Sequence, residues 1–158
     1  MKARYLLLTV LVLPVQSQAQ SPSDSLRFAS PTSLPPVRGY SQLVEIPAGS
    51  QLVFLSGQVP LDSAGHLAGQ GHLDAQTTQV FENLRRALTA AGMTFQDVVK
   101  LTFYLTDATQ LSAIRAVRDR YIDAHAPPAS SLVEVRRLFQ PGVLIEVDAV
   151  AARAPGVR

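Results

Sequence analysis

The chain of 158 residues contains no cysteine. It therefore forms no disulfide and offers no cysteine for lipid attachment, so its stability has to come from packing or from association between subunits. Charged residues are also scarce, at 16% of the chain, whereas 47% of the residues are hydrophobic. A chain of this length and apolar content can bury the core of one domain.

A long apolar run is also lacking at the N-terminus. Residues 5–15 form an apolar run of 11 residues, and a membrane-spanning helix needs roughly 20. Lys2 and Arg4 precede this run, and Ser17-Gln18-Ala19 follows it with the small residue that a signal peptidase accepts. We therefore interpret residues 1–19 as a signal peptide cleaved after Ala19, rather than as a membrane anchor. This predicts a secreted or periplasmic protein.

The mature chain would have no excess of positive charge. Without Lys2 and Arg4, the 14 basic residues fall to 12 and equal the 12 acidic ones. Proteins that bind phosphate backbones through release of counterions need a surplus of Lys and Arg. The composition therefore argues against nucleic acid as a partner.

The pattern after the signal peptide indicates one folded domain. Residues 20–38 are rich in Ser and Pro and have no apolar period, which is typical of a flexible lead-in. The folded domain is expected over residues 39–153. Two extended runs, 42–46 and 51–59, are joined by Pro, Ala, Gly and Ser, which predicts a β-hairpin.

Two helices and three further strands are expected in the remainder. A helix from Asp74 places Val80, Leu84, Leu88 and Ala91 on one face, and Gly92 can cap its C-terminus. Asp107 can cap a second helix, which carries Leu111, Ile114, Val117 and Tyr121 and stops at Pro127 and Pro128. The expected strands cover residues 98–106, 130–138 and 143–150.

The order ββαβαββ predicts an α+β fold in two layers, with two helices on one face of a mostly antiparallel sheet. The helix-facing positions are expected to be Val99, Leu101, Phe103, Val133, Val135, Ile145 and Val147. The other face would mix apolar and charged side chains, namely Lys100, Thr102, Tyr104, Leu132, Glu134, Arg136, Leu144, Glu146, Asp148 and Val150. Such a face favours association between subunits. The alternative for Glu146 and Asp148 is a solvated acidic edge.

Four segments carry a resemblance to a known family: "PPVRGYSQ" at 35–42, "LSGQVPLD" at 55–62, residues 76–107, and "LIEVDAVA" at 144–151. Together they resemble the reactive intermediate deaminase A (RidA, or YjgF) family. The resemblance implies a fold like that of trimeric chorismate mutase. It also implies a homotrimer whose three small-molecule sites lie in the clefts between subunits.

The resemblance further implies an activity and a set of site residues. Members of the family hydrolyse reactive enamines and imines to a keto acid and ammonia, without a cofactor. By motif match, Glu146 positions the water, Tyr40 belongs to the site, and the backbone of the Ser56, Gly57 and Gln58 region completes it. Packing of the Tyr40 ring is an equal alternative for that residue.

One family residue has no counterpart here. Aligned on 133–135, the segment "PPASSLVEV" places Ser130 where active members have the arginine that grips the substrate carboxylate. This predicts an altered substrate, and it predicts that Ser130→Arg would raise deaminase activity. Arg38 is a better substitute for the lost cation than Arg136 or Arg137, because Arg136 begins about 20 Å further along the same strand.

Other kinds of site find less support in the residues. A nucleophilic pair of Ser130 and His125 lacks an orienting acid and an oxyanion motif. His66, His72 and His125 fall in no metal-ligand spacing, so no metal is expected. Two functions remain open: an imine hydrolase with an altered substrate, and a non-catalytic trimer that binds a small molecule.

Overall fold

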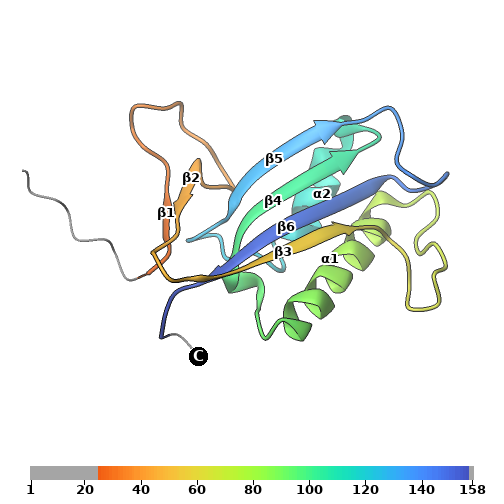
Figure 1. Ribbon diagram of the computed structural model, residues 1–158. Helices are drawn as coiled ribbons and strands as arrows, with labels where there is room; N and C mark the ends of the chain where they lie inside the picture. Colours follow the sequence, from red (N-terminus) through yellow and green to blue (C-terminus); the bar gives the residue numbers. More distant parts are fainter. Residues whose placement is uncertain (1–24, 157–158) are drawn as a thin grey trace, which may run out of the picture.

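The computed structural model describes residues 25–156. A four-stranded sheet in the order β3-β6-β4-β5 forms one layer, and two helices cover one of its faces (Figure 1). The β4–β5 pair is parallel, and the other two pairs are antiparallel. This confirms the α+β class. The elements are β3 Gln51–Gln58, α1 Leu73–Ala90, β4 Val98–Leu105, α2 Leu111–Arg118, β5 Ala129–Glu134 and β6 Ile145–Arg153.

A second, two-stranded sheet lies beside one end of the main sheet (Figure 1). Its strands are β1, Arg27–Ala29, and β2, Leu43–Glu45, joined across their edge by an ion pair between Arg27 and Glu45. Part of the expected flexible lead-in is therefore a strand. The signal peptide assigned to residues 1–19 lies outside the described residues.

The expected hairpin between residues 42–46 and 51–59 is wrong. The structure pairs β2 with β1, whereas β3 pairs with β6 at the other end of the chain. Proximity in sequence favoured the local hairpin. However, β6 is nine residues long and its side chains alternate between buried and half-buried positions, so it can form a long ladder with β3. Strand β2 has only three residues and could form only a short one. The longer ladder and the burial of Leu55 explain the non-local pairing.

Helix α1 follows its apolar period. Val80, Leu84 and Leu88 are fully buried against the sheet, as the spacing predicts. The helix ends at Ala90, and Gly92 follows the capping residue Ala91 with a φ of 69°, which suits a residue without a Cβ. The Gly92 N–H donates to the Thr89 carbonyl at 2.9 Å and the Met93 N–H donates to that of Leu88 at 2.8 Å, which is the Schellman arrangement.

The second helical segment also begins where the sequence indicates. The Asp107 Oδ1 accepts a hydrogen bond from the Thr109 N–H at 2.9 Å and opens a short 3-10 turn, η2 (Ala108–Gln110), which leads into α2. Helix α2 ends at Arg118, before the predicted Tyr121. The Tyr121 ring still packs on Phe81, with ring centres 5.0 Å apart. A second 3-10 turn, η1 (Phe95–Asp97), precedes β4.

The prediction of which side chains face the helices is correct for β4 and β6 and wrong for β5. Leu132 pairs with Phe103 in the parallel ladder and lines a cavity under α2, so it faces the helices. Val133 therefore lies on the open face of the sheet, opposite to the prediction. Because β5 is an edge strand, Leu132 and Val133 are similarly exposed, at 37% and 45%. Hydrophobicity alone therefore does not determine which of the two side chains faces the helices.

The end of β5 also differs from the prediction. The strand stops at Glu134, whose Oε2 accepts a hydrogen bond from the Ala108 N–H at 2.9 Å on the helix side of the sheet. Strand β4 lies between β5 and β6 in the sheet. Within residues 25–156, no helix has the length and apolar character needed to cross a membrane.

Candidate functional site

The residues predicted to form one site fall into two separate groups in a single copy of the chain. Tyr40 and Ser130 line a cavity of about 210 Å³ beneath α2. Gly57 and Gln58 line a different depression beside α1, and Glu146 lies on the open face of the sheet next to Gly57. Arg38 is exposed and is not among the residues that line the first cavity.

The first cavity, which we call the α2 cavity, lies between α2, the start of β5 and the segment before β2. The Ser41 N–H donates to the Pro128 carbonyl at 3.1 Å, and Ser41 forms a parallel bridge with Ala129. These contacts hold Tyr40 beside Ser130. The cavity is lined by Tyr40, Phe103, Leu111, Ile114, Arg115, Arg118, Ser130 and Leu132.

Sequence reasoning missed the two α2 arginines of this cavity. Leu111, Ile114, Arg115 and Arg118 are spaced by three and four residues, so they share one face of the helix. This spacing could have revealed them.

Arg118 is held tightly in place. Its side chain is only 13% exposed, and its Nε and Nη2 donate to the Asp119 Oδ1 at 2.8 and 2.6 Å. The guanidinium lies against Gly39, where an added Cβ would come within 2.7 Å of Nη2. The φ of Gly39 is 79°, a conformation that other residues rarely adopt. The glycine thus allows the cation to pack directly on the backbone.

The second group centres on Glu146 and Gly57. A Cβ added at Gly57 would lie 1.9 Å from Glu146 Oε1, so the carboxylate occupies the space that any other residue would fill. The β3–β6 register shifts between Leu55 and Gln58, which brings Gly57 over Glu146. Glu146 is half-buried and has no ion pair or hydrogen bond through its side chain among residues 25–156.

The open face around Glu146 is polar near β4. Tyr104 pairs with Glu146 across the ladder, and its hydroxyl donates to Asp148 Oδ2 at 3.1 Å. This hydrogen bond, together with the charge of Asp148, raises the pKa of Tyr104. The phenol therefore stays protonated and remains a donor at neutral pH.

The two groups cannot contact one small ligand within a single copy. Ser130 faces the helices and Glu146 faces away from them. Strand β4 separates their strands, and the ladder places Ser130 level with Leu101 but Glu146 level with Tyr104. Three residues along a strand correspond to about 10 Å. A site that uses both groups would need two copies of the chain.

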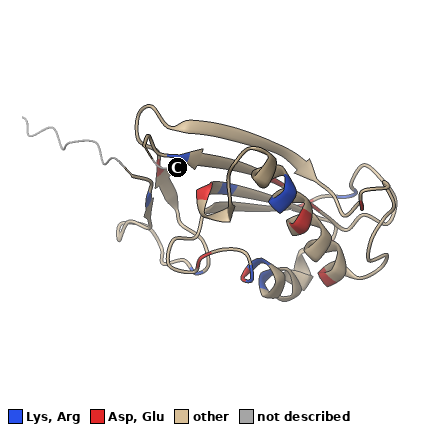
Figure 2. Ribbon diagram, turned by 90° about the horizontal axis from the view of Figure 1, so that it is seen from below, with Lys and Arg blue, Asp and Glu red and all other residues tan. Residues whose placement is uncertain are grey.

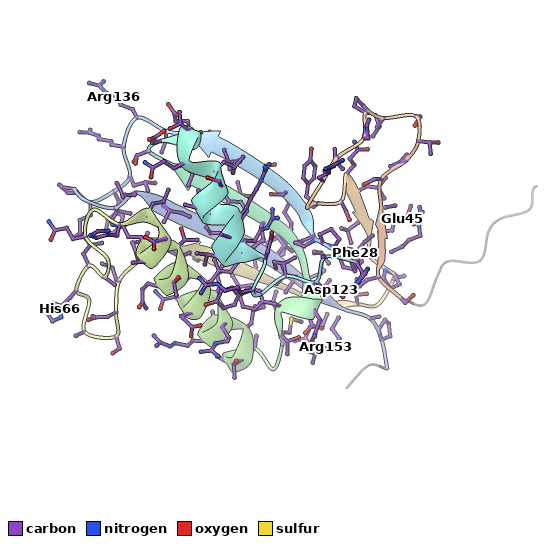
Figure 3. All side chains as sticks on the ribbon, turned by 180° about the vertical axis from the view of Figure 1, so that it is seen from behind. Phe28, Glu45, His66, Asp123, Arg136 and Arg153 are labelled. Atoms are coloured by element: carbon purple, nitrogen blue, oxygen red, sulfur yellow. The ribbon has the colours of Figure 1, made fainter. Side chains whose placement is uncertain are left out.

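The alternative sites gain nothing from the structure. His125 is not among the residues lining the α2 cavity, so it forms no pair with Ser130 there. Arg136 and Arg137 line another depression, and Figure 3 shows Arg136 at the opposite end of the molecule from Phe28 and Glu45. In residues 25–156, no three His, Asp or Glu side chains are grouped so that they could hold a metal ion.

Comparison with known proteins identifies the family. The family model described as endoribonuclease L-PSP matches residues 31–153. Protein DfrA of Myxococcus xanthus is 43% identical over 112 residues, which cover 71% of this chain and 83% of that protein. The 2-iminobutanoate/2-iminopropanoate deaminase of Salmonella typhimurium is 34% identical over 104 residues, covering 65% and 80%.

The solved structures agree. The crystal structure of YyfB from Yersinia pestis, described as a protein of the conserved Rid family, has a TM-score of 0.74 and 35% identity, covering 82% of this chain and 99% of that one. The YjgF gene product of E. coli has a TM-score of 0.59 and 32% identity, covering 72% and 87%. The chain therefore belongs to the RidA (YjgF) family.

Proposed function

We propose that this protein is a cofactor-independent hydrolase that cleaves the C=N bond of small imino acids. The observation that supports this most directly is the Glu146 carboxylate, which is half-buried, lies against Gly57 and has no partner among the described side chains. A carboxylate in this state is available to accept a proton from water. The Salmonella relative named as an iminobutanoate deaminase favours the same chemistry.

The reaction balances with water alone. The oxygen of a water molecule bonds to the carbon of the protonated imine, the π electrons of the C=N bond move to the nitrogen, and Glu146 accepts one proton of that water. Glu146 returns this proton to the nitrogen of the resulting amino alcohol, the C–N bond breaks with its electron pair leaving on ammonia, and the hydroxyl group loses its proton to solvent as the C=O bond forms. The products are a keto acid and ammonia, and no oxidant, reductant or metal is needed.

We propose that the site is shared between neighbouring subunits of a homotrimer. The open face supports association, because Leu52 and Val133 are 49% and 45% exposed and Phe54 is 76% exposed. Covering this face would bury these side chains. It would also bring the Glu146 group of one copy toward another copy, which accounts for the division of the site into two groups.

The substrate preference is proposed to follow from Ser130. A serine side chain is much smaller than an arginine side chain, and it leaves room beside Phe103, Leu111 and Leu132 in the α2 cavity. These apolar walls suit an imino acid with an aliphatic side chain. The altered substrate is therefore one that is bulkier and more apolar than the smallest imino acids.

RNA cleavage, which the description of the family model names, is not supported by the charges of this chain. Lys100, which pairs with Val150, shares the open face with two carboxylates, Glu146 and Asp148. Figure 2 shows basic and acidic residues interspersed along the ribbon, without an extended basic stretch. A surface of this kind does not attract a phosphate backbone.

The test is a hydrolysis assay on the protein beginning at residue 20. Imino acids are generated in situ from leucine and alanine by an amino-acid oxidase, and their disappearance is followed with and without the protein. Glu146→Gln should lower the rate by at least about 100-fold, because the water loses its proton acceptor. Binding of the ligand with an unchanged hydrolysis rate would instead identify a non-catalytic binding protein.

We also propose that the protein is exported and acts in the periplasm or outside the cell. Residues 1–19 have the basic, apolar and small-residue segments of a signal peptide. Mass spectrometry of the protein recovered from the periplasmic and culture fractions should show a chain that begins at Gln20. Cytoplasmic protein that retains Met1 would contradict the proposal.

A further inference from the structure

We infer that Arg115 and Arg118 of α2 form the carboxylate-binding wall of the α2 cavity and supply the cation that Ser130 does not provide. This inference rests on the proposed function, since it names the groups that would hold the substrate's acid group. The anion is thus bound by α2 instead of by β5.

The position of the two arginines supports this role. They lie one helical turn apart, and both line the cavity that contains Ser130 and Tyr40. The lining thus combines two guanidinium groups with the hydroxyl groups of Tyr40 and Ser130. All four groups are hydrogen-bond donors for a carboxylate, and a contact to a guanidinium group is assisted by charge.

The charge balance of the cavity favours an anion. Its lining contains two arginines and no acidic residue. Asp119 pairs with Arg118, but it does so through one oxygen and is 61% exposed, so it lies toward solvent. The Arg115 side chain makes no ion pair or hydrogen bond among residues 25–156. The wall therefore has at least one unneutralised positive charge.

The two arginines have different parts in this wall. The Arg118 side chain is only 13% exposed and is fixed by Asp119 and the Gly39 backbone, so it is preorganised and costs little conformational entropy on binding. Its Nη1 has no hydrogen-bond partner among the described residues and can donate to a ligand. Arg115 is exposed and can close over the carboxylate once the ligand has entered.

The remaining walls define the class of ligand. Phe103, Leu111, Ile114 and Leu132 are apolar, and the cavity of about 210 Å³ is smaller than the sites that hold drug-sized molecules. The fitting ligand is a small monocarboxylate with an aliphatic side chain. A nucleotide or a dicarboxylate would leave charge against the apolar walls.

The experiment measures binding, which requires no turnover. Ketoleucine, a branched keto acid, is titrated into the protein by calorimetry, with isobutyl methyl ketone as the analogue in which a methyl group replaces the carboxylate. We expect ketoleucine to bind the wild type, and Arg115→Gln and Arg118→Gln each to weaken it by about tenfold or more. The neutral ketone should bind weakly, and the arginine variants should not change its affinity.

The variants Arg115→Gln and Arg118→Gln are accompanied by a matched control and by a conservative variant. Arg120, two residues after Arg118, contacts Thr78 on α1 and does not line the cavity, so Arg120→Gln should bind ketoleucine like the wild type. If Arg118→Gln is unstable, Arg118→Lys keeps the charge but loses the planar fork. It should weaken binding by less than Arg115→Gln.

The outcomes separate this inference from the proposed function. Arginine-dependent binding of ketoleucine without imine hydrolysis would support the inference and overturn the hydrolase. Hydrolysis of the leucine-derived imine with an unchanged KM in both Gln variants would overturn the inference and leave the hydrolase standing. Failure of the wild type to bind ketoleucine would overturn the inference as well.

Discussion

Gly57 leaves the space in which the Glu146 carboxylate lies: a Cβ at position 57 would come within 1.9 Å of Glu146 Oε1 and 2.8 Å of its Cδ. Gly57 has no positive φ, so the backbone does not require glycine there. The requirement comes from the neighbouring strand. The glycine of the Ser-Gly-Gln segment thus positions a catalytic candidate on a strand that follows almost ninety residues later.

This contact predicts the effect of Gly57→Ala. The added methyl group must displace the Glu146 carboxylate, and we expect imine hydrolysis to fall by at least about tenfold while the melting temperature changes little, since the displaced group is the end of a flexible side chain on the open face. Enzyme assays and thermal unfolding of the same preparation measure both effects.

A double variant tests whether Gly57→Ala acts through Glu146. If it does, Gly57→Ala combined with Glu146→Gln should be no slower than Glu146→Gln alone, because the two changes remove the same function. If the double variant instead loses the product of the two single fold-reductions in rate, Gly57 affects hydrolysis by a route independent of Glu146.

The open face predicts how association can be broken. Phe54 is 76% exposed on β3 and pairs with Val150 on that face. Phe54→Glu would place a charge in the proposed subunit contact, and we expect a trimer to become a monomer at micromolar concentration. Light scattering of the purified protein measures the mass. Thr89→Glu, an equal charge on the exposed side of α1, should leave the trimer intact.

The pair of Asp97 and Arg153 predicts how stability depends on pH. Asp97 accepts from Arg153 Nε at 3.0 Å and Nη2 at 2.6 Å, and the side chains are 13% and 21% exposed. Burial works against the charged form, but the hydrogen bonds from Arg153 and Thr94 and the charge of Arg153 outweigh it. The pKa of Asp97 is therefore lower than its ordinary value of 3.8.

The ionised form of Asp97 stabilises the folded chain, because the unfolded chain binds the proton of Asp97 near pH 3.8 and the folded chain binds it only at lower pH. The contribution of the Asp97–Arg153 pair to the free energy of unfolding is therefore full above pH 3.8 and is lost as the pH falls through the pKa of Asp97 in the folded chain. Asp97→Asn should lower the free energy of unfolding at pH 7 by about 1.5–3 kcal/mol. Urea denaturation should show this difference shrinking below pH 3.8. Asp123→Asn, in an exposed turn, should change the stability little at either pH.

The sequence was most informative where local signals determine the structure. The apolar period of α1, the glycine after it and the Asp107 cap all lie within a few residues of what they control, and the structure agrees with each. The pairing of β3 with β6 depends on residues about ninety positions apart. No local pattern distinguishes this pairing from a hairpin.

The candidate site shows the same limit. The motifs identify Tyr40, Gly57 and Glu146, but they do not show that a single copy holds them in two separate places. Arg115 and Arg118 were missed because a charged residue on an amphipathic helix is ordinarily solvated. The proximity of α2 to the start of β5, which makes these arginines part of the cavity, is a property of the tertiary structure.

The arginine wall changes the outcome that we expect of Ser130→Arg. The resemblance alone predicts a gain of activity, because it treats the cation as missing. If Arg115 and Arg118 already bind the carboxylate, a third guanidinium in a cavity of about 210 Å³ adds repulsion and removes space, so Ser130→Arg alone should raise kcat/KM by less than tenfold.

In a protein that also carries Arg115→Gln and Arg118→Gln, the same substitution should raise kcat/KM by about tenfold or more, because it returns a cation to the lining of the α2 cavity. Steady-state kinetics on the leucine-derived imine, with the wild type and the three variants checked for mass and melting temperature, measures both effects. A large gain in the wild-type background would show that the cavity lacks an effective cation and that the α2 arginines do not bind the substrate.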